Sequence, residues 1–284
     1  MKTKLLWSAL LLLAATTPAV AASSNPDWHA EFPAFKIAGN LYYVGTADLA
    51  VYLIHTPEGN ILINANFPQD LPLLRKSIAA LGFKYTDTKI ALISHGHGDH
   101  DAAVGLIQKE TGAKLMVMEP DVAAVESTET GRPGAKVDRV LHDSDTVELG
   151  GAKLTARLTP GHTAGCTTWT MAVPEGSRKL NAVIIGSPNV NPGYILVGNK
   201  KYPQIAEDYV KTFNLLPSLP VDIFLGAHGA YFGMKAKYEK MKTSGGNPFL
   251  DPAGYQAYVS ERAATFRNEW ERQKKNPGSP APQR

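Results

Sequence analysis

Residues 94–101 read Ser-His-Gly-His-Gly-Asp-His-Asp and hold three of the eight histidines of the chain within six positions. The stretch follows an apolar run over residues 89–94, which predicts a buried strand, and leads into a predicted helix over residues 101–112. Loops at strand ends are where protein scaffolds place reactive groups. His95 and His97 alternate, so both imidazoles can point at one position, and the intervening glycines let the backbone bend sharply. Crowded imidazoles beside carboxylates suit zinc, cobalt, manganese or iron, so the stretch predicts a metal site.

Other side chains extend this predicted site. Asp99 and His100 fall at the start of the predicted helix, where they can bind a second ion beside the first. His162 lies in a Pro-Gly loop before a predicted strand, and His228 directly follows another predicted strand. A lone loop histidine is more often solvated than bound to a metal. His162 and His228, however, resemble His95 in position, because each lies at a strand or loop end next to a glycine. If the strands are neighbours, six side chains meet at one edge of a sandwich: His95, His97, Asp99, His100, His162 and His228.

The remaining titratable groups lack this context. Cys166 begins an apolar strand and is interpreted as a small core residue, with a ligand role as the weaker alternative. Asp101 and Glu110 are expected on the exposed side of a helix. Three histidines have no such neighbours, and the last of them, in a polar turn, is expected to be solvated: His29, His55 and His142.

Composition narrows the class of protein. The 284 residues are 44% hydrophobic and 19% charged, which is typical of a globular chain and excludes disordered and collagen-like classes. A net charge of +3 is too small and too scattered to predict a nucleic-acid partner. The single cysteine excludes an internal disulfide and any cysteine-rich zinc or iron–sulfur site.

The N-terminus predicts export. Lys2 and Lys4 precede an apolar run over residues 5–15, and Ala-Val-Ala at residues 19–21 supplies a small-x-small cleavage pattern. We interpret residues 1–21 as a secretory signal peptide, since the run is too short for a membrane anchor. Its removal leaves 263 residues with a net charge of +1, and no later stretch reaches transmembrane length. The mature protein is expected to be a monomer free of the membrane, in the periplasm if the source is a Gram-negative bacterium.

The order of predicted elements indicates one layered domain. Two mixed sheets packed face to face, with helices outside, are its simplest arrangement. We assign residues 22–275 to this domain and expect the polar, Pro-rich residues 276–284 to be disordered. Strands are expected over residues 40–44, 51–54, 61–64, 89–94, 115–118, 167–173, 181–185 and 221–225, and helices over residues 70–82, 101–112, 205–216 and from 251 onward.

The candidate ligands follow a pattern that resembles the metallo-β-lactamase superfamily. It consists of His-x-His-x-Asp-His over residues 95–100, then Gly-His-Thr around His162 and Ala-His-Gly around His228. The resemblance covers nearly all of the mature chain. It implies a four-layer αββα sandwich of the α/β class, with two zinc ions at one edge of the paired sheets. By position, the ligands of the first zinc correspond to His95, His97 and His162, and those of the second to Asp99, His100 and His228.

The second half of the chain resembles one subgroup of this superfamily. Many of its hydrolases, glyoxalase II and lactonases among them, carry a bridging Asp in the segment that corresponds to residues 185–189. Two β-lactamase subclasses use a Cys there, and Ile-Gly-Ser-Pro-Asn contains neither residue. The third β-lactamase subclass also lacks both, and residues 161–169, 191–194 and 202–209 are similar to its members.

The same resemblance implies roles in substrate binding. Tyr194 resembles the residue that assists the oxyanion of the reaction. Some members hold the substrate carboxylate with hydroxyl groups where Pro188 and Val190 stand here, so Ser187 is the nearest remaining hydroxyl. The glycines of the histidine loop stand where members commonly have Ala and an aromatic residue, which predicts a looser loop.

The function implied by the resemblance is zinc-dependent hydrolysis of the β-lactam amide bond, giving resistance to penicillins, cephalosporins and carbapenems. Zinc lowers the pKa of a water that attacks the lactam carbonyl, and Asp99 both binds metal and orients that water. Two alternatives stay open. An exported lactonase or thioesterase of the same superfamily is disfavoured by the missing Asp. A non-catalytic zinc-binding protein is disfavoured because structural zinc sites are usually closed and rich in cysteine.

Overall fold

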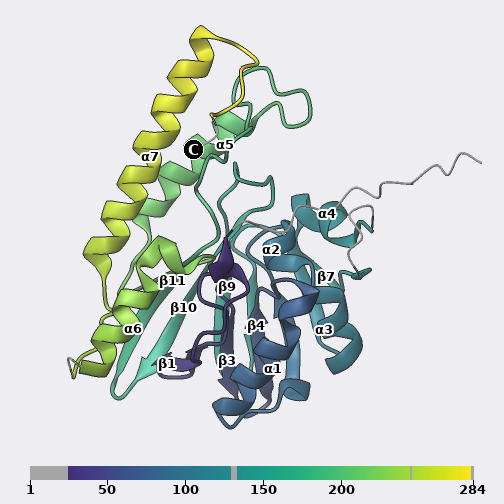
Figure 1. Ribbon diagram of the computed structural model, residues 1–284, viewed down its shortest axis with the longest axis vertical. Helices are drawn as coiled ribbons and strands as arrows, with labels where there is room; N and C mark the ends of the chain where they lie inside the picture. The colour runs from purple at the N-terminus through teal and green to yellow at the C-terminus, as the bar shows by residue number, and fades with distance from the viewer. Residues whose placement is uncertain (1–24, 129–132, 244, 283–284) are drawn as a thin grey trace, which may run out of the picture.

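The computed structural model describes residues 25–128, 133–243 and 245–282. The predicted signal peptide, residues 1–21, lies outside these ranges. Two β-sheets pack face to face, and helices cover the outer face of each sheet (Figure 1). These four layers confirm the αββα sandwich expected from the sequence. Within the described ranges, no helix combines the length and the apolar character that crossing a bilayer requires.

The first sheet has seven strands that follow chain order from β1 to β7. Strands β1 to β4 pair antiparallel, and β4 to β7 pair parallel. Leu53 and Leu62 face the outer helices, whereas Ile54 and Ile61 face the second sheet. Because both faces are buried, the strands form nearly continuous apolar runs. The strands are β1 (Phe35–Ala38), β2 (Leu41–Tyr43), β3 (Tyr52–Thr56), β4 (Gly59–Ile63), β5 (Thr88–Leu92), β6 (Lys114–Met118) and β7 (Arg139–Leu141).

The second sheet has five strands in the order β12-β11-β10-β9-β8. Strands β11 and β12 pair parallel, and the others pair antiparallel. Trp169 on β10 is 2% exposed between the sheets, and its Nε1 donates to the Ile93 carbonyl at 3.0 Å. This bond ties the second sheet to the segment that leads into the histidine loop. The strands are β8 (Thr146–Leu149), β9 (Ala152–Leu158), β10 (Thr167–Glu175), β11 (Arg178–Ile185) and β12 (Ile223–Gly226).

Helices on the first sheet include the one that carries part of the candidate site. The helix predicted over residues 101–112 begins earlier, at Gly98, and is broken in two. Its second part ends at Thr111 and is capped by Gly112, which has a left-handed φ of 73°. On this side lie α1 (Leu71–Ala80), α2 (Gly98–Asp101), α3 (Val104–Thr111) and α4 (Val122–Glu126) (Figure 1). On the other side lie α5 (Ile205–Leu215), α6 (Met234–Thr243) and α7 (Pro252–Lys275).

The loops that carry the candidate ligands meet at one edge of the sandwich. The Thr167 N–H, at the start of β10, donates to the Ser94 carbonyl at 2.7 Å. On the other side of the same edge, the Ala50 N–H donates to the Ala227 carbonyl at 3.0 Å. These backbone contacts join the two sheets where β5 and β12 end, so the histidines that follow each strand lie close together.

The segment after α7 differs from its prediction. We expected residues 276–284 to be disordered, but the structure places residues 276–282 beside α7, with backbone hydrogen bonds to residues 193–197. The Arg272 guanidinium donates to the Pro280 carbonyl at 2.7 Å and holds the chain after it turns back. A Pro-rich composition therefore did not prevent order, because α7 supplies the hydrogen-bonding partners.

Candidate metal centre

The structure brings all six predicted ligands together. The ligand atoms of His95, His97 and His162 lie within 4.8 Å of one another, and so do those of His95, Asp99 and His100. His228 joins the second set, since its Nε2 is 3.2 Å from His100 Nε2 and 3.4 Å from Asp99 Oδ2. We call His95, His97 and His162 the first set and Asp99, His100 and His228 the second set, and His95 lies next to both.

The first set consists of three imidazoles packed edge to face. The ring of His95 lies 4.9 Å from that of His97 and 4.6 Å from that of His162. Burial and the neighbouring imidazoles lower the pKa of His95 well below its usual range and that of His162 to about 3. Neutral imidazoles with converging ring nitrogens are the donors that a zinc-type cation takes. The first set therefore fits a metal ion.

The second set combines a carboxylate with two imidazoles. Burial raises the pKa of the Asp99 carboxyl, but His100 and His228 outweigh burial and hold this pKa far below its usual range. His228 shows the reciprocal effect, because Asp48 and Asp99 outweigh its burial and raise its pKa to about 9. An ionised carboxylate facing two ring nitrogens also fits a divalent cation.

Partners outside the ligand sets fix the orientation of three imidazoles. His162 Nδ1 donates to the Asn189 carbonyl at 2.9 Å, and His228 Nδ1 lies 2.9 Å from Asp48 Oδ2. A carbonyl oxygen only accepts, so this contact places a proton on His162 Nδ1 and leaves the lone pair on Nε2. His95 Nδ1 contacts the Ser94 hydroxyl at 3.1 Å. Such outer partners set the tautomer and the aim of metal-binding histidines.

A buried carboxylate joins the two loops that supply the first set. Asp121 is 3% exposed and accepts from the Gly96 N–H at 2.8 Å, the Thr163 hydroxyl at 2.7 Å and the Gly165 N–H at 2.8 Å. A Cβ atom on Gly165 would lie 2.6 Å from the Asp121 backbone nitrogen, so only glycine allows this approach. The sequence analysis missed Asp121, because nothing in its spacing relates it to the histidines.

A cavity of about 390 Å³ opens onto both ligand sets. Trp28 and Tyr231 form aromatic walls, with ring centroids 5.7 and 5.0 Å from that of His228. Sequence reasoning missed both, and only the position of Tyr231 three residues after a predicted ligand could have pointed to it. The lining residues are Asn25, Trp28, Asp48, His97, Asp99, His162, Asn191, His228, Ala230 and Tyr231.

The predicted substrate contacts lie behind this cavity. Ser187 is 2% exposed, and its hydroxyl is 3.1 Å from the Tyr231 hydroxyl. The Tyr194 hydroxyl donates to the His162 carbonyl at 2.7 Å. Neither residue is among the described residues that line the cavity. Asn191 and Tyr231 are among the residues that line it.

Four other side chains were assigned positions from the sequence. Cys166 is fully buried, and burial raises the pKa of its thiol to about 12, so the interpretation as a core residue holds. Asp101 is 3% exposed, contrary to the expected exposed position, because α2 points it into the protein. Glu110 lies near the surface and pairs with Arg75. His142 is exposed, as expected.

Comparisons with known proteins agree with this geometry. A model of the metallo-beta-lactamase superfamily matches residues 49–173. A hydroxyacylglutathione hydrolase from Rhodopseudomonas palustris (strain BisB5) is 31% identical over 190 residues, which span 66% of this chain and 64% of that relative.

Two solved structures are similar over almost their whole length. Native FEZ-1 metallo-beta-lactamase from Legionella gormanii is 50% identical, with 86% of this chain and 98% of that chain covered and a TM-score of 0.84. BJP-1, a subclass B3 metallo-beta-lactamase of Bradyrhizobium japonicum, is 36% identical. The match covers 88% of this chain and 98% of that chain, with a TM-score of 0.83. The chain therefore belongs to the metallo-β-lactamase superfamily of metal-dependent hydrolases, and its structural neighbours are class B3 enzymes.

Proposed function

We propose that this protein hydrolyses the amide bond of β-lactam antibiotics in a zinc-dependent reaction, with penicillins, cephalosporins and carbapenems as substrates. The observation that carries the proposal is the second ligand set, in which Asp99, His100 and His228 converge without a cysteine. Residues 185–189 supply neither the Cys nor the Asp that other members of the superfamily use. The 50% identity to FEZ-1, named a metallo-β-lactamase, supports the same substrate class.

The six candidate ligands would bind two zinc ions. His95, His97 and His162 would hold one zinc ion, and Asp99, His100 and His228 a second. Zinc, when bound, supplies a Lewis acid that lowers the pKa of water and polarises a carbonyl oxygen.

The protein's own groups prepare the site for this chemistry. Asp99 stays ionised, so its carboxylate can accept a hydrogen bond from the attacking water and orient it. Asn189 and Asp48 hold His162 and His228 in fixed orientations, which avoids reorganisation during the reaction. Trp28 offers an apolar wall for the substrate at the cavity. The Tyr194 hydroxyl, bonded to the His162 carbonyl, braces the His162 loop, and it could assist the oxyanion only after releasing that carbonyl.

The proposed substrates act on cell-wall synthesis, outside the cytoplasm. We therefore also propose that residues 1–21 direct export and that the mature monomer works in the periplasm. The lysines, the apolar run and the Ala-Val-Ala site of the N-terminus support this location. N-terminal sequencing of the protein recovered from a periplasmic extract tests it, and a mature protein that still begins at Met1 would contradict it.

A second candidate function is thioester hydrolysis. Relatives that are named hydroxyacylglutathione hydrolase match about two thirds of this chain at 25–32% identity. The same metal centre can attack a thioester carbonyl. The lack of an Asp in residues 185–189 favours the lactam reaction over this alternative.

The deciding experiment compares a carbapenem with a hydroxyacylglutathione thioester as substrates of the mature chain loaded with zinc. We expect loss of carbapenem absorbance, its arrest by a chelator and its recovery when zinc is restored. Thioester turnover without carbapenem turnover, in protein shown to contain zinc, would overturn the β-lactamase proposal and support the alternative.

A further inference from the structure

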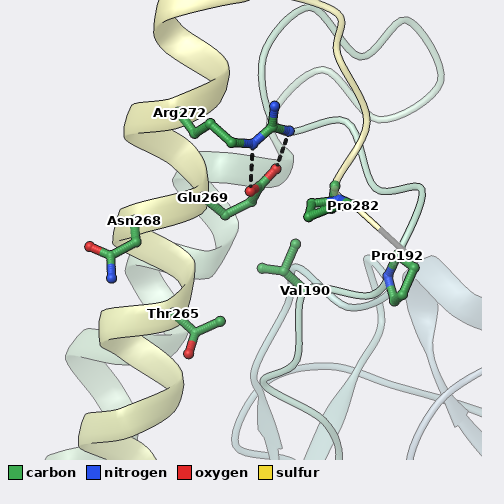
Figure 2. Close-up of a pocket in the computed structure, with 8 residues that line it drawn as sticks. Val190, Pro192, Thr265, Asn268, Glu269, Arg272 and Pro282 are labelled. Carbon is green, nitrogen blue, oxygen red and sulfur yellow. Dashed lines mark hydrogen bonds and ion pairs between the residues drawn. The ribbon is translucent and has the colours of Figure 1, made fainter. Parts of the chain in front are cut away.

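The chain turns back at the end of α7 and runs down beside that helix (Figure 1, yellow). We call residues 276–282 the C-terminal strap. Arg272 holds its middle, since the guanidinium donates to the Pro280 carbonyl at 2.7 Å while pairing with Glu269 at 2.6 Å. Figure 2 shows this ion pair on α7, with Pro282 of the strap facing Val190 across a cavity of about 280 Å³. The strap is thus fixed between α7 and the loop that follows β11.

The strap pairs with the backbone of that loop. The Gly193 N–H donates to the Ala281 carbonyl at 2.8 Å, and the Ala281 N–H donates to the Tyr194 carbonyl at 2.8 Å. A third bond joins the Gly278 N–H to the Val197 carbonyl at 3.1 Å. Ala281 is 7% exposed, so these bonds are shielded from water. Ala281 thus accepts from Gly193 and donates to Tyr194, and the two bonds fix the position of the Tyr194 backbone.

A buried glutamine completes this anchorage. Gln273 of α7 is fully buried, and its Oε1 accepts from the Leu196 N–H at 2.6 Å. Its Nε2 donates to the Tyr194 carbonyl at 3.0 Å, so that carbonyl accepts from both α7 and the strap. A carbonyl oxygen has two lone pairs, and both are used here. The backbone at Tyr194 therefore has little freedom to move while the strap is in place.

The side chain of Tyr194 carries this constraint to the metal centre. Its hydroxyl donates to the His162 carbonyl at 2.7 Å, and the two rings lie 5.7 Å apart. A continuous series of contacts thus runs from Ala281 through Tyr194 to a loop that supplies a metal ligand. We propose that the C-terminal strap is a positioning element that sets Tyr194 against the His162 loop and supports turnover at the metal centre. The effect of the strap on turnover rests on the proposed function, whereas its effect on the position of Tyr194 does not.

The first test measures the structural link without turnover. A chain that ends at Lys275 lacks the strap, and a chain that ends at Pro282 keeps every contact described above and serves as the matched control. We expect amide hydrogen exchange in a peptide covering residues 189–197 to accelerate roughly tenfold or more without the strap, because Gly193 loses its acceptor. A peptide from β10 should exchange equally in both chains. Unchanged exchange in residues 189–197 would overturn the proposal.

A point variant covers the case in which the shorter chain does not fold. Ala281→Pro removes the N–H by which the strap donates to the Tyr194 carbonyl, and it leaves the Gln273 bond to that carbonyl and the rest of the strap in place. We expect the same direction of change in exchange, with a smaller amplitude. Protection equal to that of the unaltered chain would show that the Ala281 bond does not hold the loop.

The second test separates positioning from general stability. Removing the strap should lower kcat/KM for a carbapenem by roughly 3- to 30-fold, as expected for a misplaced group near the reaction. In a Tyr194→Phe background the same removal should change kcat/KM less than about twofold, because the hydroxyl through which the strap acts is already absent. An equal loss in both backgrounds would overturn the positioning role. Absence of β-lactam turnover in the unaltered chain would instead refute the proposed function, and hydrogen exchange would then decide the strap alone.

Discussion

The Asp48 carboxylate lies 2.9 Å from His228 Nδ1 and turns the opposite ring nitrogen toward Asp99 and His100. Asp48 also accepts from the Ala230 N–H at 2.9 Å, so it fixes both the ring and the turn that follows it. The orientation of one candidate ligand therefore depends on a residue 180 positions earlier in the chain. This relationship links the first sheet to the metal centre.

Loss of this contact should weaken metal binding. We expect Asp48→Ala to reduce the zinc affinity of the second set about 10- to 100-fold, as is typical when an outer partner of a metal-binding histidine is removed. Chelator competition on the purified protein measures this affinity. Asp27→Ala is the matched control, because Asp27 pairs with Lys235 on the surface. Equal zinc affinity in the two variants would show that Asp48 does not support His228.

Asp121 is expected to contribute mainly to stability. Asp121→Asn removes one acceptor oxygen and introduces an N–H₂ group that faces buried donors. An unpaired buried polar group costs about 1–3 kcal/mol, so the free energy of unfolding should fall by that amount. Urea denaturation of the zinc-free protein measures it. Asp143→Asn, at an exposed aspartate that accepts one backbone N–H, should change stability by less than about 0.5 kcal/mol.

The close approach of Gly165 to Asp121 gives an independent test of the same contact. Gly165→Ala would place a methyl group 2.6 Å from the Asp121 backbone nitrogen, and overpacking of this kind costs about 1–3 kcal/mol. Gly246→Ala is the control, since no atom lies within 4 Å of the added Cβ. Thermal unfolding of both variants checks the prediction. A Gly165→Ala protein as stable as the control would mean that the two loops separate at little cost.

The Cys166 thiol should be unreactive in the folded protein. Burial raises the pKa of its thiol to about 12, so almost none is thiolate between pH 7 and pH 10, and its sulfur is fully buried. We expect a thiol reagent to label it only in denaturant. Labelling that accelerates when a chelator removes zinc, while the protein stays folded, would indicate that Cys166 is a metal ligand after all.

The sequence was enough to predict the layers and to select the six side chains that the structure brings together. His95, His97 and His100 share a short loop, and strand ends place His162 and His228 at the same edge. Asp48 and Asp121 could not be predicted, because each reaches the site through the packing of a distant segment and has no regular spacing from a histidine.

The hydrogen bonds of the segment after α7 could not be predicted from the sequence, for a related reason. Its composition, rich in Pro and polar residues, is typical of disorder. Its order depends on Arg272 and Gln273, which look like ordinary surface residues in the helix pattern. Similarly, Ser187 was selected for its hydroxyl, but the fold directs that hydroxyl at Tyr231. Composition and motif position do not determine such pairwise contacts.

The assignment of His228 to a second metal ion can be tested directly by metal content. Its Nε2 lies 3.4 Å from Asp99 Oδ2, so His228→Ala leaves Asp99 and His100 as the remaining ligands of the second set. Catalytic zinc sites usually have three protein ligands, and two should not retain the ion through dialysis. We therefore expect zinc content to fall from two ions per chain to one.

His142→Ala is the control for this measurement, because His142 is an exposed histidine far from any ligand set in the sequence. It should keep the zinc content and the carbapenem turnover of the unaltered chain, whereas His228→Ala should lose most turnover. Two full equivalents of zinc in His228→Ala would contradict the ligand assignment. Because the first set does not include His228, retention of one equivalent would also show that the two sets bind their ions independently.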